Sequence, residues 1–463
     1  MGSLPNRFAG SPPTERQASS GLSILIVGGG IAGLGFAIEA HRKGHDVRII
    51  DRRPHFDDYG DMIGIGDSAL RSMEHWPGFL DECQKSPFAK TMSLDAFSYE
   101  DRRIGELGKG LGMSRAEFHS LLHQYAQRVG VPIRYSARAV DYFETDEGAG
   151  VVLENGEEIT ADIVAAADGI GSRSWRLVAG TKEQPISSGF AMFRSTFPVE
   201  LALQNPLVAK GLAGADVVSR LYFGPGAHLV MGKTPKDMIW MLTHKDDGNS
   251  EEDWAKPANP KDALPYVKDW APWLQELVKV TPNDGVVDFK LMWRNPRETW
   301  VSPKARVVQI GDAAHTFLPT SASGATMALE DGLSLAALLH LSGKKDAPLA
   351  LRVQNKLRFE RVTCAQKMGF KNRENYHNTD WDAAARDPSS VLKMVDRWVT
   401  SHDPERYAYE MYEKCAAHIV SGGDESFQNT NTPPGHTFKL WTVAELLALA
   451  DRGERIVDDG DWS

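Results

Sequence analysis

The spacing of apolar and polar residues near the start of the chain predicts a strand, a helix and a second strand. Residues 23–27, SILIV, form a short apolar run that predicts a buried strand. The next segment places Leu34, Ala37, Ile38 and His41 on one face at helical spacing. A second strand, DVRII, ends just before Asp51. A β-α-β unit of this kind, about 30 residues long, implies a parallel sheet.

A long helix is predicted over residues 114–129, SRAEFHSLLHQYAQRV. Ser114 and Glu117 have the spacing of a capping box. The apolar residues that follow keep helical spacing: Phe118, Leu121, Leu122, Tyr125, Ala126 and Val129. Further along, GVVLENGEEIT predicts a hairpin that turns at Asn155-Gly156. The segment DIVAAADG predicts another buried strand, which ends at Asp168-Gly169.

The pattern changes from about residue 181 to residue 284, where strand-like pieces alternate with Pro and Gly turns. The buried-strand pattern returns with ARVVQIGD, and after residue 346 the chain is helical and charged, with Trp381 and Trp398 as packing anchors. We therefore expect a flexible tail over residues 1–21 and a discontinuous first domain over 22–181 and 285–345. A separate sheet domain follows over 182–284, and a C-terminal helical region over 346–463.

Composition and charge narrow the class of protein. The chain has 463 residues, 42% hydrophobic and 25% charged, which is typical of a soluble globular protein. The net charge of −10 argues against nucleic acid or an anionic membrane as the main partner. Three distant cysteines, Cys83, Cys364 and Cys415, provide no disulfide framework and fit a reducing compartment. No secretory signal and no transmembrane run are predicted, so we expect a cytoplasmic protein.

A glycine-rich turn joins the first strand to the first helix. It carries Gly28-x-Gly30-x-x-Gly33, and Asp51 follows at the end of the second strand. Gly28 allows the tight turn, Gly30 lets the backbone approach a pyrophosphate, and Gly33 lets helix and strand pack closely. Asp51 can bind the ribose hydroxyls of an adenosine. Together with the β-α-β frame, these residues predict a bound nucleotide. There is no second fingerprint of this kind, and the glycines of GKGLGMS follow no buried strand.

The segment VVQIGDAAHTFLPTSASGATMALEDG, residues 307–332, places an acid at the end of a buried strand and then opens a helix near Gly324. A helix N-terminus offers free N–H groups and a partial positive charge, which suit an anion or a polarised ring edge. The segment therefore indicates that Asp312 and the helix start face a bound group.

Three motifs, taken together and in this order, resemble the class A (single-component) flavoprotein monooxygenases of the para-hydroxybenzoate and salicylate hydroxylase type. They are GGGIAG with Asp51, DIVAAADGIGSRSWR, and GDAAHTFLPTSASGATMALED, and the resemblance spans residues 22–345. It implies the α/β class: a Rossmann-type FAD-binding domain, an inserted mixed β-sheet that binds substrate, and a C-terminal helical region. The texture is most similar to fungal secondary-metabolism members.

The resemblance also implies roles for individual residues. Asp312 would bind the ribityl chain of a tightly but non-covalently held FAD, and the helix start at Gly324 and Ala325 would face the pyrimidine edge. Gly64 and Arg115 are expected to contact the flavin. Asp168, in the second motif with Gly169, Ser172 and Arg176, is expected to serve the flavin and the nicotinamide. Thr316 stands where the family often has Pro, and Ser321-Ala322-Ser323 replaces its glycine-rich run, which changes the cavity beside the reactive carbon.

The chemistry implied by the resemblance uses NAD(P)H and O₂ as co-substrates and proceeds through a flavin C4a-hydroperoxide. Arg194, a cation in an otherwise apolar strand, and Tyr222 are the candidate catalytic residues. The alternatives are a domain-interface salt bridge for Arg194 and a core tyrosine for Tyr222. His228, His244 and His315 show no metal-ligand spacing, so no metal is expected.

The expected substrate is an electron-rich aromatic compound, either a phenol or an indole, that is hydroxylated or epoxidised. Indole 2,3-epoxidation in alkaloid biosynthesis is the sharper hypothesis. Salicylate-like decarboxylative hydroxylation is a second hypothesis, and a non-catalytic flavin-binding protein is a third. The sequence has neither the WxWxIP motif of flavin halogenases nor the two dinucleotide fingerprints of Baeyer–Villiger enzymes.

Overall fold

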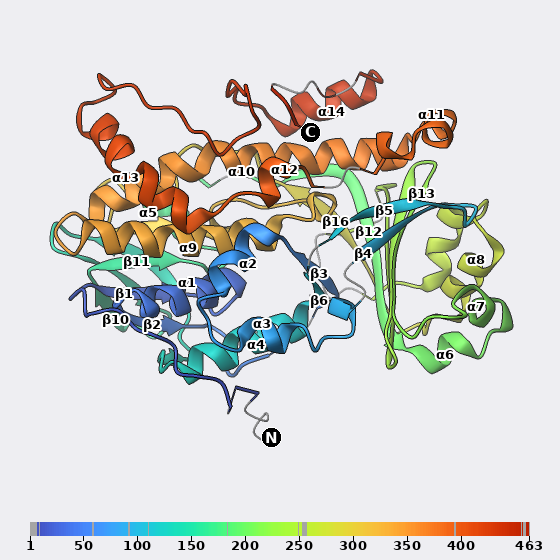
Figure 1. Cartoon of the computed structure of the whole chain (residues 1–463), viewed down its shortest axis with the longest axis horizontal. Coiled ribbons are helices and arrows are strands. Elements are labelled where there is room, and N and C mark those ends of the chain that lie inside the picture. The colour runs from blue at the N-terminus through green and yellow to red at the C-terminus, as the bar shows by residue number, and fades with distance from the viewer. Residues whose placement is uncertain are drawn as a thin grey trace.

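The computed structural model of the chain places two large sheets side by side, joined by a layer of helices (Figure 1). The structure describes residues 7–8, 10–57, 60–90, 93–109, 111–182, 184–248, 250–251, 257–392, 395–454, 456 and 460–462. We name the part of the chain around the first sheet the nucleotide-binding domain and the part around the second sheet the substrate domain, after the roles that the sequence leads us to expect. The α/β fold class expected from the sequence is confirmed.

The nucleotide-binding domain contains a five-stranded parallel sheet in the order β17-β11-β1-β2-β7. Its strands are β1 (Ser23–Val27), β2 (Asp46–Ile50), β7 (Ile133–Arg134), β11 (Ile163–Ala166) and β17 (Val307–Gln309). β17 arrives from far along the chain and pairs in parallel with β11. Beside it, β8 (Ala139–Glu144), β9 (Ala149–Leu153) and β10 (Glu158–Ala161) form an antiparallel sheet whose β9–β10 hairpin turns at Gly156, as predicted.

The substrate domain contains a seven-stranded sheet in the order β16-β12-β15-β14-β13-β4-β5. Its strands are β4 (Ser93–Ser98), β5 (Arg103–Lys109), β12 (Ile186–Pro198), β13 (Val218–Gly224), β14 (Ala227–Lys233), β15 (Asp237–Lys245) and β16 (Val286–Trp293). β4 and β5 lie within the span that the sequence analysis gave to the first domain. β4 joins the sheet by parallel pairing with β13, a long-range contact that no local pattern reveals. A small two-stranded sheet of β3 (Met62–Ile65) and β6 (Leu111–Ser114) lies between the two domains.

Helices cover both domains. They are α1 (Ile31–Arg42), α2 (Asp67–Met73), α3 (Phe79–Cys83), α4 (Arg115–Arg128), α5 (Trp175–Val178), α6 (Val199–Leu203), α7 (Pro206–Gly211), α8 (Pro272–Val280), α9 (Gly324–Ser342), α10 (Ala347–His377), α11 (Trp381–Arg386), α12 (Arg397–Thr400), α13 (Pro404–Val420) and α14 (Val443–Asp451). In the described part of the chain there are also five 3₁₀ segments: Phe88–Lys90, Pro260–Val267, Gly311–Ala313, Pro319–Ser321 and Pro388–Ser390. The long helix α10 runs from the nucleotide-binding domain to the substrate sheet (Figure 1).

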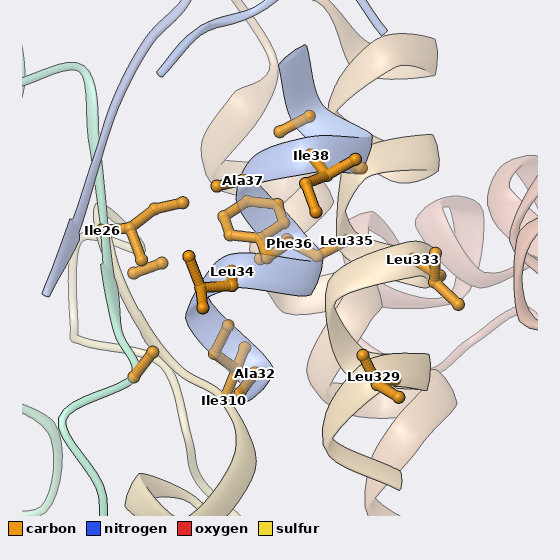
Figure 2. Packing of buried hydrophobic residues seen from close by; sticks show 14 of the residues in the cluster. Ile26, Ala32, Leu34, Phe36, Ala37, Ile38, Ile310, Leu329, Leu333 and Leu335 are labelled. Carbon is orange, nitrogen blue, oxygen red and sulfur yellow. The ribbon is translucent and has the colours of Figure 1, made fainter. Parts of the chain in front are cut away.

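The core of the nucleotide-binding domain forms where α1 packs between the sheet and α9 (Figure 2). Phe36 and Leu329 are fully buried at this crossing, and the side chains of Leu34 and Ile26 fill the layer beneath it. A Cβ added at Gly332 would come within 2.8 Å of the Phe36 backbone, so the small residue in α9 permits the close approach. This packing fixes the N-terminal ends of α1 and α9, which both face the cavity described below.

Two local expectations need correction. Ser114 caps α4 by accepting a hydrogen bond from the Glu117 amide, as predicted, but the Glu117 carboxylate contacts Arg7 instead of completing a capping box. Residues 1–21 were expected to form a flexible tail, of which residues 1–6 and 9 lie outside the described residues. Phe8 is instead buried, because its ring stacks on Phe79 of α3 and meets the Tyr125 ring of α4 edge-on. Within the described chain, no helix is long and apolar enough to cross a membrane.

Candidate active site

A cavity of about 1130 Å³ lies between the two domains and is lined by residues of both. In the parallel sheet, Gly28 follows β1, Asp51 follows β2, and Asp168 and Asp312 lie beyond β11 and β17. The carboxyl ends of parallel strands share one edge of a sheet, where α/β folds bind their ligands. The topology thus brings four predicted residues from distant motifs to one cavity wall.

The glycine turn provides a cradle at this wall. Gly28 has φ of +107°, and its Cβ would meet the Ala167 carbonyl oxygen at 2.4 Å. A Cβ on Gly33 would lie 2.0 Å from the Gly28 oxygen, so Gly33 serves the close helix–strand packing that was predicted and does not line the cavity. A Cβ on Gly30 would meet no protein atom within 4 Å. Only a bound group would require glycine there, and Gly30 also precedes the uncapped N-terminus of α1.

Asp51 is held at the cavity edge by its neighbours. Its Oδ2 accepts a hydrogen bond of 2.8 Å from the Gly29 amide, and its Oδ1 accepts one of 2.8 Å from the Arg53 amide. Burial alone would raise the pKa of Asp51, but the hydrogen bonds from Arg53 and Gly29 lower it below its usual value. The carboxylate is therefore charged and fixed in position, as a partner of ribose hydroxyls must be.

His119 was missed by the sequence analysis, although it lies on the predicted helix 114–129. Its Nε2 donates a hydrogen bond of 2.7 Å to the Gly29 carbonyl, and the residue lines the cavity. Burial, together with the charges of Arg53 and Arg115, lowers the pKa of His119 to about 4. A neutral imidazole thus fixes the peptide that follows Gly29. A lone helical histidine carries no sequence signal for this role.

Asp168 and Gly169 form the turn after β11, as the second motif predicted. Gly169 has φ of +77°, which favours glycine. Tyr142 donates a hydrogen bond of 2.8 Å to Asp168 Oδ2. Burial raises the pKa of the Asp168 carboxyl, against hydrogen bonds from Ser172 and Tyr142 that lower it. Asp168 lines the cavity, whereas Arg176 lines neither this cavity nor the smaller one described below and instead lies 3.9 Å from Asp141.

The loop that carries Asp312 is held in place by contacts with Asp331 of α9. The Gly311 amide donates to Asp331 Oδ2 at 3.0 Å, and His315 Nε2 lies 2.6 Å from the same oxygen. Burial would raise the pKa of Asp331, but the charges of His315 and Arg358 hold it below its usual value. Asp312 itself is exposed to the cavity, and its enclosed position raises the pKa of its carboxyl. These contacts with Asp331 do not involve the Asp312 side chain, which therefore stays available to a ligand.

The helix start predicted near Gly324 is confirmed, because α9 begins at that residue. Gly324 and Ala325 line the cavity, together with the replaced run Ser321-Ala322-Ser323. Gly64 and Arg115 line it from β3 and α4, and a Cβ on Gly64 would meet no protein atom within 4 Å. Thr316 is buried behind this wall, and its carbonyl accepts a hydrogen bond of 2.7 Å from Gln366. The cofactor-binding residues predicted from the sequence, apart from Gly33, therefore line one cavity.

Arg194 lies at the junction of the two domains. Side chains alternate along β12, so Arg194 projects from the same sheet face as Met192, which lines the cavity. Arg194 itself is not among the lining residues. Its Nη1 donates to Asp61 Oδ2 at 2.9 Å, and Thr196 Oγ1 donates to Asp61 Oδ1 at 3.1 Å. The interface salt bridge considered as an alternative is thus present, at the edge of the cavity.

Tyr222 does not fit the catalytic position expected for it. Its strand β13 is separated from β12 by β14 and β15, so the two are not neighbours. Side-chain alternation turns Leu221 toward the cavity and Tyr222 toward the opposite face, where helices cover the sheet. There the hydroxyl donates to Asp101 Oδ1 at 3.1 Å and accepts from Arg220. Tyr222 matches the core tyrosine that was the alternative.

The substrate-domain half of the cavity has no charged residue among its described lining residues. These are Leu94, Leu107, Met192, Ser219, Leu221, His228, Val230, Met241, Thr243 and Tyr376. His228 and Thr243 lie directly opposite each other on β14 and β15. Burial lowers the pKa of His228 to about 3, so this imidazole is neutral. This half of the cavity suits an apolar body with a few uncharged polar groups.

A second cavity of about 350 Å³ adjoins the first one at Gly171, Arg173 and Asp312. Four cationic side chains line it: Arg173, Lys182, Arg294 and Arg297. Trp175 and Trp300 also contribute to its walls. Cations beside aromatic rings can bind a phosphate-bearing ring system. None of the described residues form a group of three or more that could hold a metal ion.

Comparisons with known proteins agree with this geometry. The family described as FAD binding domain matches residues 22–352. The FAD-dependent monooxygenase fsr3 of Gibberella fujikuroi is 39% identical over 473 residues, which cover 97% of this chain and 91% of that protein. The crystal structure of CtdE in complex with FAD and substrate 4 is 31% identical, with a TM-score of 0.79 over 86% of this chain and 100% of that one. A salicylate hydroxylase substrate complex shares the fold at 22% identity, with a TM-score of 0.71 over 84% of this chain and 97% of that one.

Proposed function

Because the chain belongs to the class A FAD-dependent monooxygenases, we propose that it uses NAD(P)H and O₂ to hydroxylate or epoxidise an electron-rich aromatic compound. The substrate we propose is a phenol or an indole of fungal-type secondary metabolism. One oxygen atom enters the substrate and the other leaves as water, while NAD(P)H and a proton supply the two electrons and two protons. The single observation that carries the proposal is one cavity with a nucleotide-binding half and an uncharged, largely apolar half.

FAD is expected to lie along the cavity wall formed by the parallel strand ends. The residues that would hold it are Gly28, Gly30, Asp51, Gly64, Arg115, Asp168, Asp312, Gly324 and Ala325, all of which line the cavity. When bound, FAD would accept two electrons from NAD(P)H and use them to activate O₂. The protein has to orient the substrate and exclude water from the enclosed site.

Salicylate-like decarboxylative hydroxylation is the weaker hypothesis. A substrate carboxylate buried in the apolar half would need a cationic partner. The described lining of that half offers none. Uncharged aromatic rings fit the same lining without this cost.

Arg194 remains our candidate for the oxygen-transfer step. It projects from the sheet face that borders the cavity, and Asp61 fixes its guanidinium. The Asp61 carbonyl also accepts a 2.6 Å hydrogen bond from the Arg115 amide, so Arg194 is tied to the start of α4, where we expect Arg115 to contact the flavin. We propose that Arg194 donates a hydrogen bond to the substrate or to the oxygen being transferred.

The second cavity is the proposed docking site for NAD(P)H. Its cations suit the phosphates of the dinucleotide, and it meets the main cavity at Gly171, Arg173 and Asp312. Lys182→Gln and Arg297→Gln should each raise the KM for NAD(P)H several-fold while FAD content stays unchanged. Arg176→Gln is the matched control, because Arg176 lines neither cavity. An unchanged KM for NAD(P)H in both test variants would show that NAD(P)H does not dock in the second cavity.

The function itself is tested with purified yellow protein, NAD(P)H and ¹⁸O₂ against a panel of phenols and prenylated indoles. We expect substrate-dependent NAD(P)H oxidation and a product that gains one ¹⁸O atom by mass spectrometry. FAD binding without NAD(P)H consumption for any aromatic compound would instead support a non-catalytic flavin-binding protein. Loss of CO₂ from salicylate would support the decarboxylative alternative.

A further inference from the structure

His228 and Thr243 form a small polar site in the apolar half of the cavity. They lie directly opposite each other on the antiparallel strands β14 and β15, and both line the cavity. The two residues are 3% and 2% exposed. Opposite residues on paired antiparallel strands have Cβ atoms about 4.5–5.5 Å apart, so one ligand group can reach both side chains.

One polar atom of each side chain opens on the cavity. His228 Nε2 and Thr243 Oγ1 form no hydrogen bond with a described residue of the chain, and neither is among the atoms that the protein encloses completely. The hydroxyl of Tyr376 in the same wall differs, because it is fully enclosed. Since polar groups in enclosed sites nearly always have a partner, a molecule in the cavity has to provide it for these two atoms.

The imidazole of His228 is held by two neighbours from α10. Its Nδ1 lies 2.7 Å from His377 Nε2, and its ring meets the ring of Tyr376 edge-on, with centroids 5.5 Å apart. Burial lowers the pKa of His228 to about 3 and also holds the pKa of His377 below its usual value, so both imidazoles are neutral. A fixed, uncharged ring can select a ligand by the position of its polar group.

The two neutral histidines, together with Thr243, offer the ligand one donor and one acceptor. If His228 donates from Nδ1 to His377, its Nε2 is an acceptor and the Thr243 hydroxyl can donate. If His377 donates instead, His228 Nε2–H is the donor and Thr243 can accept. A ligand hydroxyl donates and accepts at one oxygen, so it fits both arrangements. An indole N–H can only donate and a carboxylate can only accept, so each would leave one partner unmatched.

Apolar side chains surround the pair. On the same sheet face Met192 lies opposite Thr243, and Val230 and Met241 lie opposite each other in the next row. None of the described residues that line this half of the cavity is charged. An anionic substrate group would therefore lack a cation here, whereas an aromatic ring can pack on the apolar residues.

We propose that His228 and Thr243 bind the substrate through one uncharged phenolic hydroxyl. His228 Nε2 and Thr243 Oγ1 contact its oxygen, and the apolar row beside them carries the aromatic ring. The inference deepens the proposed function and rests on it, because it assigns the apolar half of the cavity to the substrate. It narrows the substrate class to phenols, in preference to indoles without a hydroxyl and to carboxylated rings.

The test compares 1-naphthol with naphthalene, which lacks only the hydroxyl, on the FAD-loaded protein. Binding is measured by the change in flavin absorbance. Thr243→Val keeps the shape of the side chain and should weaken 1-naphthol about 3- to 15-fold, the loss of one hydrogen bond, while naphthalene stays unchanged. His228→Asn keeps an amide for His377 but removes Nε2, and it should lower the preference for 1-naphthol over naphthalene by a similar factor.

Ser195→Ala is the matched control, because it removes a buried hydroxyl from the opposite face of the same sheet and Ser195 does not line the cavity. It should bind both probes like wild type. 1-Methoxynaphthalene, which can accept but not donate, should bind wild type more weakly than 1-naphthol does.

Each other outcome decides the question. Equal weakening of both probes by Thr243→Val would make Thr243 a packing residue. An unchanged preference for 1-naphthol in both variants, or no such preference in the wild type, would overturn the phenol assignment. Turnover of an indole without a hydroxyl that Thr243→Val leaves intact would overturn it as well, while the proposed function would stand. Selective 1-naphthol binding without NAD(P)H turnover for any aromatic compound would overturn the proposed function alone.

Discussion

The guanidinium of Arg194 lies 2.9 Å from the carboxylate of Asp61, across the junction between the substrate sheet and the nucleotide-binding domain. The pair fixes the position of the one cation that borders the apolar half from β12. Both side chains are largely buried, so removing one partner leaves the other charge without its match. Variants of the two residues can therefore distinguish a structural role of Arg194 in this salt bridge from a role in oxygen transfer.

Arg194→Leu should retain FAD and reduction by NAD(P)H but lose oxygen transfer, by roughly 10²–10³ for a preorganised donor. Reduced flavin should then release hydrogen peroxide. Asp61→Asn is the matched variant, because its amide oxygen can still accept from Arg194, and it should lose much less product. Product and peroxide per NAD(P)H are measured in both. Wild-type product yield in Arg194→Leu would show that Arg194 has no role in oxygen transfer and serves only in the interface salt bridge.

Gly30 and Gly33 should respond differently to alanine, although both belong to one fingerprint. Gly33→Ala places a Cβ 2.0 Å from the Gly28 oxygen, so the cofactor-free fold should lose about 1–3 kcal/mol of unfolding free energy. Gly30→Ala meets no protein atom within 4 Å and should unfold like wild type. A clash with the pyrophosphate should still weaken FAD binding, on the order of 10- to 100-fold. Equal FAD affinity in Gly30→Ala and wild type would refute the assignment of Gly30 to pyrophosphate binding.

Asp51→Ala should weaken FAD binding by about 1.5–3 kcal/mol, because it removes charge-assisted hydrogen bonds to the ribose. The carboxylate also accepts the Gly29 amide, so part of the loss should come from a looser glycine turn. Asp51→Asn separates the two, since its amide oxygen can keep the Gly29 contact while the charge is lost. Titration of cofactor-free protein with FAD measures all three affinities. Full retention of FAD by Asp51→Ala after dialysis would contradict the assignment.

His119 should make stability depend on pH. Its pKa falls from the usual 6.5 to about 4 on folding, so the unfolded chain binds more protons between these values. The free energy of unfolding should therefore decrease as the pH falls from 6.5 through 4, by about 3 kcal/mol for this group. His119→Gln keeps a donor for the Gly29 carbonyl and does not titrate. Chemical unfolding at several pH values should show a shallower slope for this variant, although His45 and His123, with pKa values lowered to about 4, add to the slope in both proteins.

The sequence by itself determined the nucleotide-binding half. Gly28, Asp51 and Asp168 each end a buried strand, and such strands show as apolar runs with a turn residue at the end. Local steric demands at the glycines and at the start of α9 also have local signatures. Parallel strand ends meet at one edge of a sheet, so identifying the strands was sufficient to bring the motifs together.

Only the tertiary structure decided the substrate half. The pairing of β4 with β13, the strand order between β12 and β13, and the reach of α10 across both domains are long-range contacts. Side-chain alternation then decides which residues face the cavity, and a shift of one position separates Leu221 from Tyr222. For the same reason Asp61 could not be recognised from sequence. It takes its role from Arg194, a partner that only the folded chain brings within reach.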